Sequence, residues 1–594
     1  MSDLFVDRYP EQARVVRAAL TTSFIAFGVG ALFGLLQALH RTDILRVVES
    51  PTYYTLLTGH GVFLVVTFTI FFLVGLYQWA VTDSLGRGPV DIRLTWSWYG
   101  LMSIGTLLAA IAILAGFLSD PPEVLGSELS ADVLFTFYAP LQANPIFYIG
   151  LVLFVVGTWL AGADWFRTWW AWKGDNPGER IPLPTFMVLT TMIMWYISSI
   201  GVAVAILAFI LPWSLGLTES LNPTLTRTLF WYFGHPVVYF WLLPAYLLWY
   251  IVLPKLAGGR LFSDPLARVV FILFVLLSTP VGIHHQYLDP GIAEGFKFIA
   301  MTNTMFLLLP SLLTAFTVVA SIEHGARQRG GEGTFNWLRA LPWRDPAFTG
   351  MALAGLVFAF GGFTGIVNAG MNINYLVHNA LWVPGHIHTQ VGTAVALTAM
   401  AGSYWLVPQL TGNRLVGRQV ALFQVVLWFL GVVFMTNSMY RGGLIGMPRR
   451  TAEPEYAFDY DVGVGSVTEL DVQLALGGIL LFISAMLFLA IMLLTAFNDD
   501  SEPIVDGTIP PALSGPEDSP RILDDLRVWV GIALVLVVIA YTIPLASIVD
   551  RGGLFGPDVS PFPVVTDVLA AQPLVVDAIM VLQHAVPHAG ALIT

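Results

Sequence analysis

The sequence predicts an all-α protein that forms a polytopic transmembrane bundle of about thirteen helices. Composition is the first reason: of the 594 residues, 56% are hydrophobic and 11% are charged, whereas a soluble protein carries roughly 25% charged residues. Patterning is the second reason, because the apolar residues gather in runs of about 20 or more. An α-helix of that length crosses the hydrocarbon of a bilayer.

The apolar runs place the spans in order along the chain. We expect them at residues 15–40, 53–80, 95–118, 146–170, 185–213, 227–253, 268–287, 297–320, 348–370, 381–408, 418–438, 470–496 and 526–549. They predict one membrane-embedded domain over residues 1–594, with an acidic cytoplasmic connection at 498–523. The tail at 550–594 is apolar but contains several prolines, which favours an outer or interfacial segment over another span.

Charge predicts the orientation of the bundle. Lys and Arg gather in the N-terminal segment and in the connections after even-numbered spans, and none occurs in 119–144, 214–226, 288–296 and 371–380. Because Lys and Arg favour the cytoplasmic side, we expect a multi-pass protein of a prokaryotic cell membrane, with its N-terminus inside and its C-terminus outside.

The overall charge and the missing cysteines exclude several classes of function. The net charge is −12 and there are no cysteines. A nucleic-acid partner is excluded because no basic surface is present, and the acidic composition fits a salt-loving organism. Without cysteine the chain cannot hold an iron–sulfur cluster, a thiolate-ligated haem or a thiolate copper centre.

Six histidines are expected at one depth, in the outer third of the bilayer. A histidine inside a membrane is costly unless it has a partner, and it is usually functional. Because four different spans bring these imidazoles to the same depth, packing alone is a poor explanation and metal binding is favoured. The residues are His60, His235, His284, His285, His386 and His388.

Three of these histidines suit one copper ion. His284 and His285 are adjacent on span 7, and His235 on span 6 completes a three-imidazole set. With no carboxylate or thiolate, such a set fits copper that binds a small ligand, with zinc as the alternative. Tyr239 follows His235 by four residues and therefore shares its helix face, where a phenol can supply both a proton and an electron.

The other three histidines suit haem iron. His386 and His388 are two residues apart, so their side chains point about 200° apart around one helix. His60 and His388 could ligate one iron from both sides, which gives a saturated electron-transfer haem, while His386 could bind a second iron that faces the three-histidine metal. Arg449 and Arg450 lie in an outer connection, where an arginine pair fits the haem propionates.

Four motifs carry these residues: Gly234-His235-Pro236-Val237-Val238-Tyr239, Ser278-Thr279-Pro280-Val281-Gly282-Ile283-His284-His285-Gln286, Trp382-Val383-Pro384-Gly385-His386-Ile387-His388 and Pro448-Arg449-Arg450. With them the chain resembles subunit I of the haem–copper oxygen reductases, the catalytic subunit of terminal respiratory oxidases. It is most similar to the B family. The A family has Glu where Val237 stands here, so the resemblance implies that the glutamate route of the A family is absent. The resemblance extends from span 1 to span 13.

The resemblance implies a proton-translocating enzyme that reduces O₂ to water. It implies a low-spin, b-like haem on His60 and His388, a high-spin haem on His386, and copper on His235, His284 and His285. It also implies a covalent link between Tyr239 and His235.

A single proton path from the cytoplasmic side fits hydroxyl groups on spans 6 and 8 and in one inner connection. These residues are Tyr246, Tyr250, Ser263, Ser311 and Thr314. Asn374 and His378 mark a possible proton exit in the outer connection before the two-histidine helix. The family often carries Asp where Asn374 stands, so the exit route differs here.

Partners follow from the missing cysteines and from the resemblance. A dinuclear copper acceptor would lie on a subunit II, fed by cytochrome c or a blue-copper protein. A nitric oxide reductase is the alternative on the same scaffold, but that class has iron in place of copper and lacks the tyrosine. A non-enzymatic transporter is the other alternative, for which inverted repeats and broken helices are expected.

Overall fold

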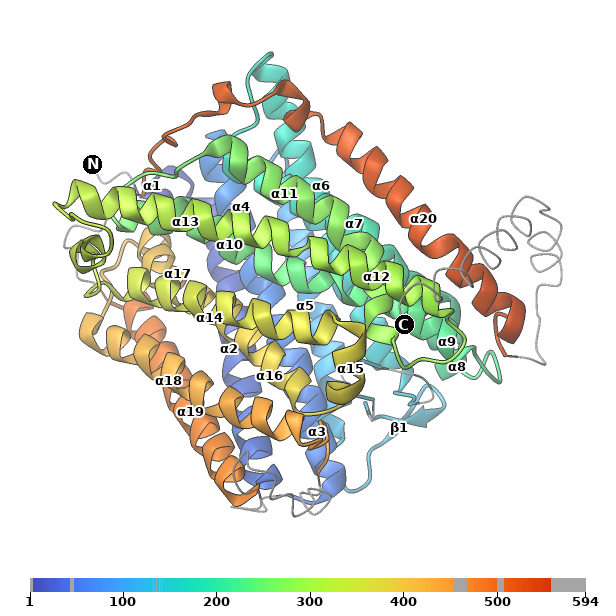
Figure 1. Cartoon of the computed structure of the whole chain (residues 1–594). Helices are drawn as coiled ribbons and strands as arrows, with labels where there is room; N and C mark the ends of the chain where they lie inside the picture. Colours follow the sequence, from blue (N-terminus) through green and yellow to red (C-terminus); the bar gives the residue numbers. More distant parts are fainter. Residues whose placement is uncertain are drawn as a thin grey trace, which may run out of the picture.

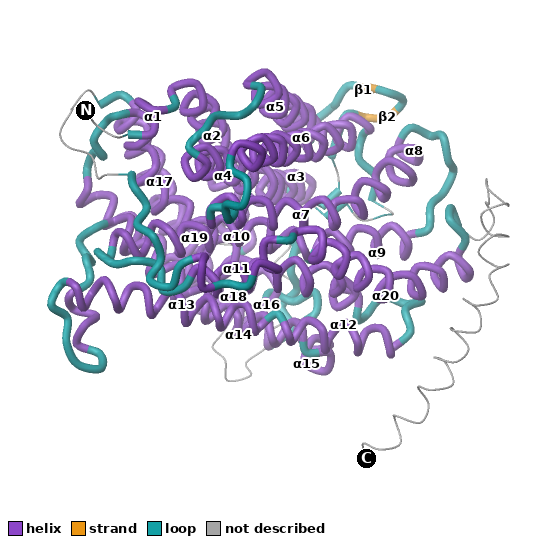
Figure 2. Tube along the Cα trace, turned by 90° about the horizontal axis from the view of Figure 1, so that it is seen from above, coloured by secondary structure: helices purple, strands orange, loops and turns teal. Residues whose placement is uncertain are grey.

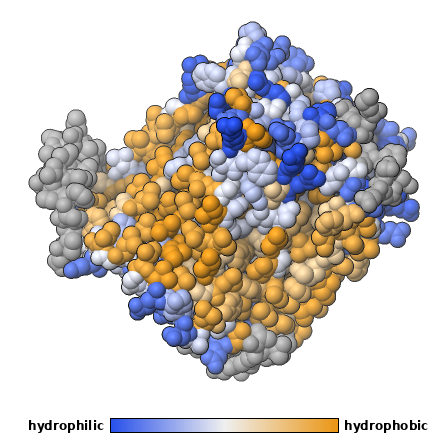
Figure 3. Space-filling model, turned by 180° about the vertical axis from the view of Figure 1, so that it is seen from behind, coloured by the Kyte–Doolittle hydropathy of each residue, from blue (hydrophilic) through white to orange (hydrophobic). Residues whose placement is uncertain are grey.

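The computed structural model describes residues 4–452, except 43–47, 132, 135, 138 and 140, together with 467–498 and 507–556. Within these residues, thirteen helical segments are long and apolar enough to cross a membrane. Figure 1 shows them packed side by side, and Figure 3 shows a broad apolar surface with hydrophilic residues gathered toward opposite ends. The predicted all-α membrane bundle is confirmed.

The first five spans end within a few residues of their predicted limits. They are α2 (Pro10–Arg41), the continuous run α3 (Ser50–Gly61), η1 (Val62–Phe68) and α4 (Thr69–Leu85), then α5 (Ile92–Ala115), α6 (Pro145–Asp175), and the run α7 (Leu183–Val204), η2 (Ala205–Ile210) and α8 (Leu211–Ser214). A short helix α1 (Phe5–Arg8) precedes them, and the two-stranded hairpin β1 (Glu123–Val124) and β2 (Ser127–Glu128) lies at the edge of the bundle in Figure 2.

The middle spans carry most of the candidate residues. They are α9 (Pro223–Gly234) with α10 (Pro236–Leu256), α11 (Asp264–Ser278) with η3 (Thr279–Gln286), α12 (Glu294–Phe306) with α13 (Leu308–Gln328), α14 (Pro346–Ala369), and α16 (Trp382–Thr389) with η5 (Gln390–Val395) and α17 (Ala396–Thr411). Between them lie η4 (Asn336–Ala340) and α15 (Met371–Val377). Among these spans the one from α16 to α17 is the most enclosed, because 94% of its most apolar 18-residue stretch is buried.

The last spans are α18 (Arg418–Leu444), α19 (Val467–Ala496) and α20 (Leu526–Gly552). Part of the predicted acidic connection, residues 499–506, falls outside the described residues, as does the tail from residue 557. The described part of the connection holds two 3₁₀ turns, η7 (Pro516–Asp518) and η8 (Arg521–Asp524).

Every span that carries one of the six histidines departs from a regular α-helix beside it. The π-helical segment η1 begins two residues after His60, and the π-helical segment η5 begins two residues after His388. His235 stands at the junction of α9 and α10, directly before Pro236. His284 and His285 lie on the 3₁₀ helix η3. Such irregular turns are frequent at functional sites because they re-aim side chains.

A buried ion-pair network joins three segments that are distant in the sequence. The Arg268 guanidinium on α11 is fully buried and donates to Asp264 one turn earlier at 2.5 Å and to Asp524 on η8 at 2.6 Å. Arg180, before α7, also donates to Asp524. Because each buried charge has an opposite charge as its partner, the network fastens the connection before α20 to the bundle.

Candidate metal centre

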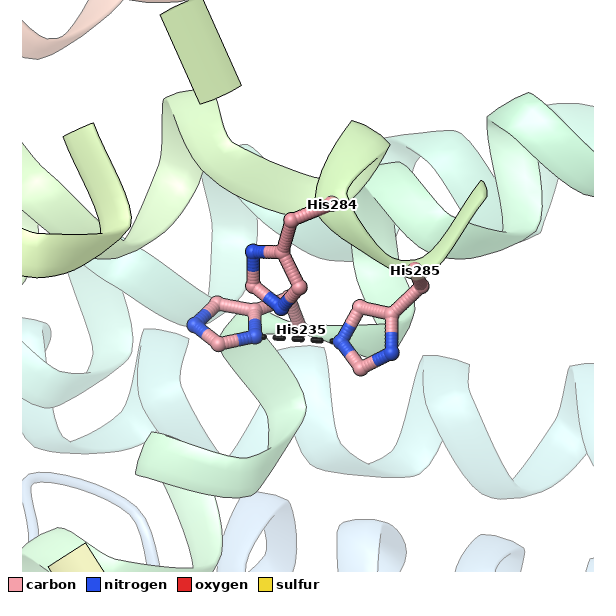
Figure 4. Close-up of side chains that lie close together, drawn as sticks. All are labelled: His235, His284 and His285. Atoms are coloured by element: carbon pink, nitrogen blue, oxygen red, sulfur yellow. Dashed lines mark hydrogen bonds between the residues drawn. The ribbon is translucent and has the colours of Figure 1, made fainter. Parts of the chain in front are cut away.

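His235, His284 and His285 converge as predicted. Their ligand nitrogens all lie within 4.8 Å of one another, and Figure 4 shows the His235 ring, from the α9–α10 junction, facing the two rings of η3. Nδ1 of His235 lies 3.1 Å from Nε2 of His285. Bonds of about 2.0–2.1 Å from each nitrogen reach one ion between the rings, so the donor set fits a single imidazole-bound metal.

Neighbouring side chains fix the orientation of two of these rings. The His285 ring stacks on Trp231 with centroids 3.9 Å apart and an interplanar angle of 4°. Nδ1 of His284 lies 2.8 Å from the Thr304 hydroxyl of α12. Contacts of this kind hold a metal-binding imidazole in one orientation. Neither Trp231 nor Thr304 was predicted, because stacking and cross-span contacts leave no spacing signal.

Tyr239 lies against the same cluster. Its hydroxyl is 3.1 Å from Nε2 of His235, the nitrogen on the far side of the ring from His285. His235 therefore faces the other two histidines with one nitrogen and the phenol with the other. The structure brings Tyr239 and the three histidines together as the spacing predicts, and the covalent link stays a prediction.

His60 and His388 form a second pair. Their ring centroids are 6.1 Å apart, with an interplanar angle of 21°. Nδ1 of His60 donates to the Gly30 carbonyl at 2.9 Å, and Nδ1 of His388 donates to the Pro384 carbonyl at 2.7 Å. Because a carbonyl only accepts, Nε2 of each neutral ring keeps its lone pair. Two metal–nitrogen bonds plus two ring radii span roughly 6 Å, so the pair fits one iron.

His386 lies on α16 with His388 but contacts a different set of residues. Its Nδ1 is 3.0 Å from the Thr364 hydroxyl on α14, which in turn is 3.1 Å from the Tyr440 hydroxyl on α18. Tyr440 also lies 2.9 Å from the Thr389 hydroxyl. This row of hydroxyls holds the His386 ring through its Nδ1 side, which suits binding of iron through Nε2. Thr364 and Tyr440 were not found from the sequence.

Two glycines make room for the haem-type histidines. A Cβ on Gly34 of α2 would lie 2.7 Å from Cε1 of His60, and a Cβ on Gly365 of α14 would lie 3.0 Å from Cε1 of His386. Each imidazole therefore packs against the bare backbone of the neighbouring helix. A larger residue at Gly34 requires the His60 ring to move.

Four of the five predicted proton-path residues lie together between α10 and α13. The Tyr250 hydroxyl is 2.7 Å from Thr314 Oγ1, and the Tyr246 hydroxyl is 3.5 Å from Ser311 Oγ. Ser263 is placed differently: its hydroxyl caps α11 by accepting from the Leu266 amide at 3.2 Å.

Two unpredicted hydroxyls continue the row along α13. Thr317 and Ser321 are fully buried, three and seven residues beyond Thr314. Ser321 Oγ accepts from the Phe262 amide at 2.9 Å, next to Ser263. A helix-period search for serine and threonine from Thr314 onward would have found both.

The connection before α16 and the connection after α18 bring the predicted arginine pair and the exit residues beside α16. The Leu381 amide donates to the Met447 carbonyl, and the Arg449 amide donates to the Asn379 carbonyl, both at 2.8 Å. The Arg449 side chain donates to Asn379 Oδ1 at 3.1 and 2.8 Å. Arg450 takes a positive φ of 63°, uncommon for a residue with a side chain.

Asn374 and His378 contact each other. Nδ1 of His378 lies 3.1 Å from Asn374 Oδ1. Burial, together with the positive charges of Arg449 and Arg227, lowers the pKa of His378 to about 4, while Asp289 acts in the opposite direction. Asp289 accepts from Arg227 at 2.8 Å and from Gln286, directly after His285, at 2.9 Å.

Known proteins share this architecture. Residues 14–480 match the family model described as Cytochrome C and Quinol oxidase polypeptide I. Cytochrome c oxidase subunit 1 of Thermus thermophilus is 41% identical over 553 residues, covering 90% of this chain and 94% of that protein. Cytochrome c oxidase polypeptide 1 of Halobacterium salinarum is 25% identical over 460 residues, covering 73% and 71%.

A solved structure agrees with these relatives. One chain from a cryo-EM structure of a heme-copper terminal oxidase dimer superimposes with a TM-score of 0.84 at 35% identity, covering 93% of this chain and 96% of that chain. The sequence motifs, the helix bundle and the histidine geometry therefore agree with the comparisons. The chain belongs to the subunit I family of haem–copper oxidases, the oxidoreductases of respiratory chains.

Proposed function

We propose that this chain holds copper through His235, His284 and His285, a low-spin b-like haem through His60 and His388, and a high-spin haem through His386. Within the oxidase these sites would serve the reduction of O₂ to water. The observation that carries the proposal is the position of Tyr239, with its hydroxyl 3.1 Å from the His235 ring that faces the other two copper ligands.

When bound, the haem iron and the copper supply the O₂-binding position and most of the electrons. The part of the protein is to position groups and to move protons. Tyr239 can give both its hydroxyl proton and an electron. With Nδ1 of the neutral His235 ring used for copper, Nε2 would carry the ring proton and donate a hydrogen bond to the phenol oxygen. The oxidised phenol must then regain both an electron and a proton before the next turnover.

The hydroxyl row between α10 and α13 supports a supply route for that proton. Tyr250 with Thr314, and Tyr246 with Ser311, form two hydrogen-bonded steps below Tyr239. Thr317 and Ser321 extend the row toward Ser263. Hydroxyls in helices often donate to their own backbone, and Thr314 does so to the Pro310 carbonyl. The row of hydroxyls is therefore not continuous by itself, and the proposal includes water molecules between its steps.

His378 is the titratable group of the proposed exit. Asn374 cannot hold a proton, whereas His378 lies beside it with a pKa lowered to about 4. A carboxylate close to Arg449, such as a haem propionate, would raise that pKa toward neutrality. His378 would then take up and release protons, in place of the carboxyl that the family often carries at the neighbouring position.

Subunits I of this family work with a subunit II and cytochrome c. We infer that the dinuclear copper acceptor lies on that subunit, because this chain has no cysteine. Either cytochrome c or a blue-copper protein would then deliver electrons from outside. The charge pattern supports a cytoplasmic N-terminus and an outer C-terminus.

Metal analysis together with a pyridine haemochrome spectrum tests the assignment. The purified oxidase should contain two haems and one copper per copy of this chain, in addition to any copper in subunit II, and should consume O₂. Iron in place of that copper, with turnover of nitric oxide, would instead support the reductase alternative. A protein without metal would contradict the ligand assignments altogether.

A further inference from the structure

A surface groove lies on the C-terminal half of α6, away from the metal centre. It is lined by Val90, from the connection between α4 and α5, and by Phe166, Arg167, Trp170 and Ala171 of α6, and its volume is about 360 Å³. The neighbouring surface also exposes an aromatic side chain: on α5, next to Thr95 which contacts Asp164, Trp96 is 41% exposed.

Arg167 brings a positive charge into this groove, where the nearby Asp164 carboxylate attracts it only through space. It forms no hydrogen bond or ion pair with any residue in the part of the chain that the structure describes. The nearest acid on its own helix, Asp164, points the other way: its carboxylate is buried against α5, where it accepts from Thr95 Oγ1 at 2.6 Å and Trp98 Nε1 at 3.3 Å. The guanidinium is exposed and makes no hydrogen bond among the described residues, so its N–H donors are open to a group from outside the chain.

The depth of the groove indicates what that partner is. Arg167 lies eight residues before the end of α6, or about 12 Å along the helix. Trp170, at 76% exposure, stands one turn closer to that end. Exposed tryptophan and arginine at the same helix end mark the headgroup level of a bilayer. At this level a guanidinium meets lipid phosphates, which it binds with paired N–H donors.

We propose that the groove binds the phosphate of an anionic phospholipid in the leaflet at the C-terminal end of α6. Arg167 donates to the phosphate oxygens, and Phe166 and Trp170 pack against the glycerol and the first acyl carbons. The site does not depend on the metal assignments, because none of its residues contacts a candidate ligand of haem or copper.

Native mass spectrometry of the delipidated holoenzyme tests this inference. Phosphatidylglycerol and phosphatidylcholine with identical acyl chains are titrated separately. We expect the wild-type enzyme to bind one phosphatidylglycerol more tightly than any phosphatidylcholine. R167Q should weaken that step roughly five-fold, the effect of removing one surface cation, and R167K should retain most of it.

Arg418 provides the matched control. It is exposed at the start of α18 but already paired with Asp345 at 2.7 Å, so R418Q removes the same charge without emptying a lipid site. An equal loss in R418Q would show a general charge effect and overturn the proposal. So would unchanged binding in R167Q, equal affinity for both lipids, or displacement of the lipid by free phosphate. W170A, which leaves the cation in place, should weaken both lipids at this site.

Discussion

Tyr239 and His235 are neighbours because the chain changes helix between Gly234 and Pro236. A proline at the first position of α10 costs no hydrogen bond there, so α10 can begin directly after the histidine. Tyr239 then lies one turn into the new helix, and its hydroxyl reaches Nε2 of His235 at 3.1 Å. The motif therefore sets the contact locally, which is why the sequence alone could predict it.

Removing the Tyr239 hydroxyl should abolish turnover without disturbing the cofactors. We expect Y239F to lower O₂ consumption by at least ~10², the lower range for a group that transfers a proton directly. The haem spectra and the copper content should stay as in the wild type. Y196F is the control, because the Tyr196 hydroxyl donates to the Trp159 carbonyl, away from the histidines. Comparable turnover in both variants would argue against a role for Tyr239.

Adding one methyl group beside His60 should remove the low-spin haem. In G34A the new Cβ would come within 2.7 Å of the ring, which forces His60 out of line with His388. The low-spin absorption band should shrink or vanish while copper is retained. G355A is the matched control, because a Cβ on that helical glycine has nothing within 4 Å. A normal spectrum in G34A would contradict the assignment of His60.

At the scale of elements, the sequence predicted the positions of the helices but not the π- and 3₁₀-helical segments within them. Apolar runs located all thirteen spans, since lipid leaves no alternative to burying a long run of apolar residues in a helix. The π-helical turns after His60 and His388 had no sequence signal, and neither did the Thr364–Tyr440 contact behind His386. These features arise from packing between spans that are far apart in the chain, which periodicity within one span does not reveal.

The third prediction concerns the hydroxyl contacts between α13 and α10. T314A removes the hydroxyl that pairs with Tyr250 at 2.7 Å. We expect turnover to fall by roughly tenfold, less than the ~10² of a direct proton donor, because water can substitute in part. Stopped-flow measurements should show slower proton-coupled steps with unchanged haem spectra. T302A, an exposed threonine on α12 of the same span, should behave like the wild type, and equal behaviour of the two variants would speak against this route.

At the scale of the whole molecule, the ion-pair network around Arg268 holds the last span to the others. Asp524 accepts from both Arg268 and Arg180, so one carboxylate joins η8, α11 and the segment before α7. Breaking a buried pair from one side leaves charges without partners, which typically costs 3–5 kcal/mol. The sequence showed an acidic connection here but not its partners, because an ion pair across more than 200 residues has no local signature.

D524N should therefore lower the stability of the assembled protein. We expect a loss of roughly 3 kcal/mol, at the lower end for buried pairs because Arg268 keeps Asp264. Thermal unfolding in detergent, followed by loss of the haem absorption, measures it. The next residue is the control: within the described residues the ion-pair partner of Asp525 is Arg527, which is 97% exposed, so D525N should change stability by less than about 1 kcal/mol. If both variants unfold alike, the network is not a structural anchor.

The helix α16 has a mechanical consequence. It spans only Trp382–Thr389 and carries both His386 and His388, two residues about 3 Å apart along the helix axis. On the proposed assignment these two residues would hold the two haems. Their relative position is then fixed by helix pitch and not by side-chain packing between helices. If the bundle expands on heating, or the membrane changes in thickness, His386 and His388 would move together because they lie on the same short helix. The step that electrons must take between the two haems would keep its length while the surrounding helices move.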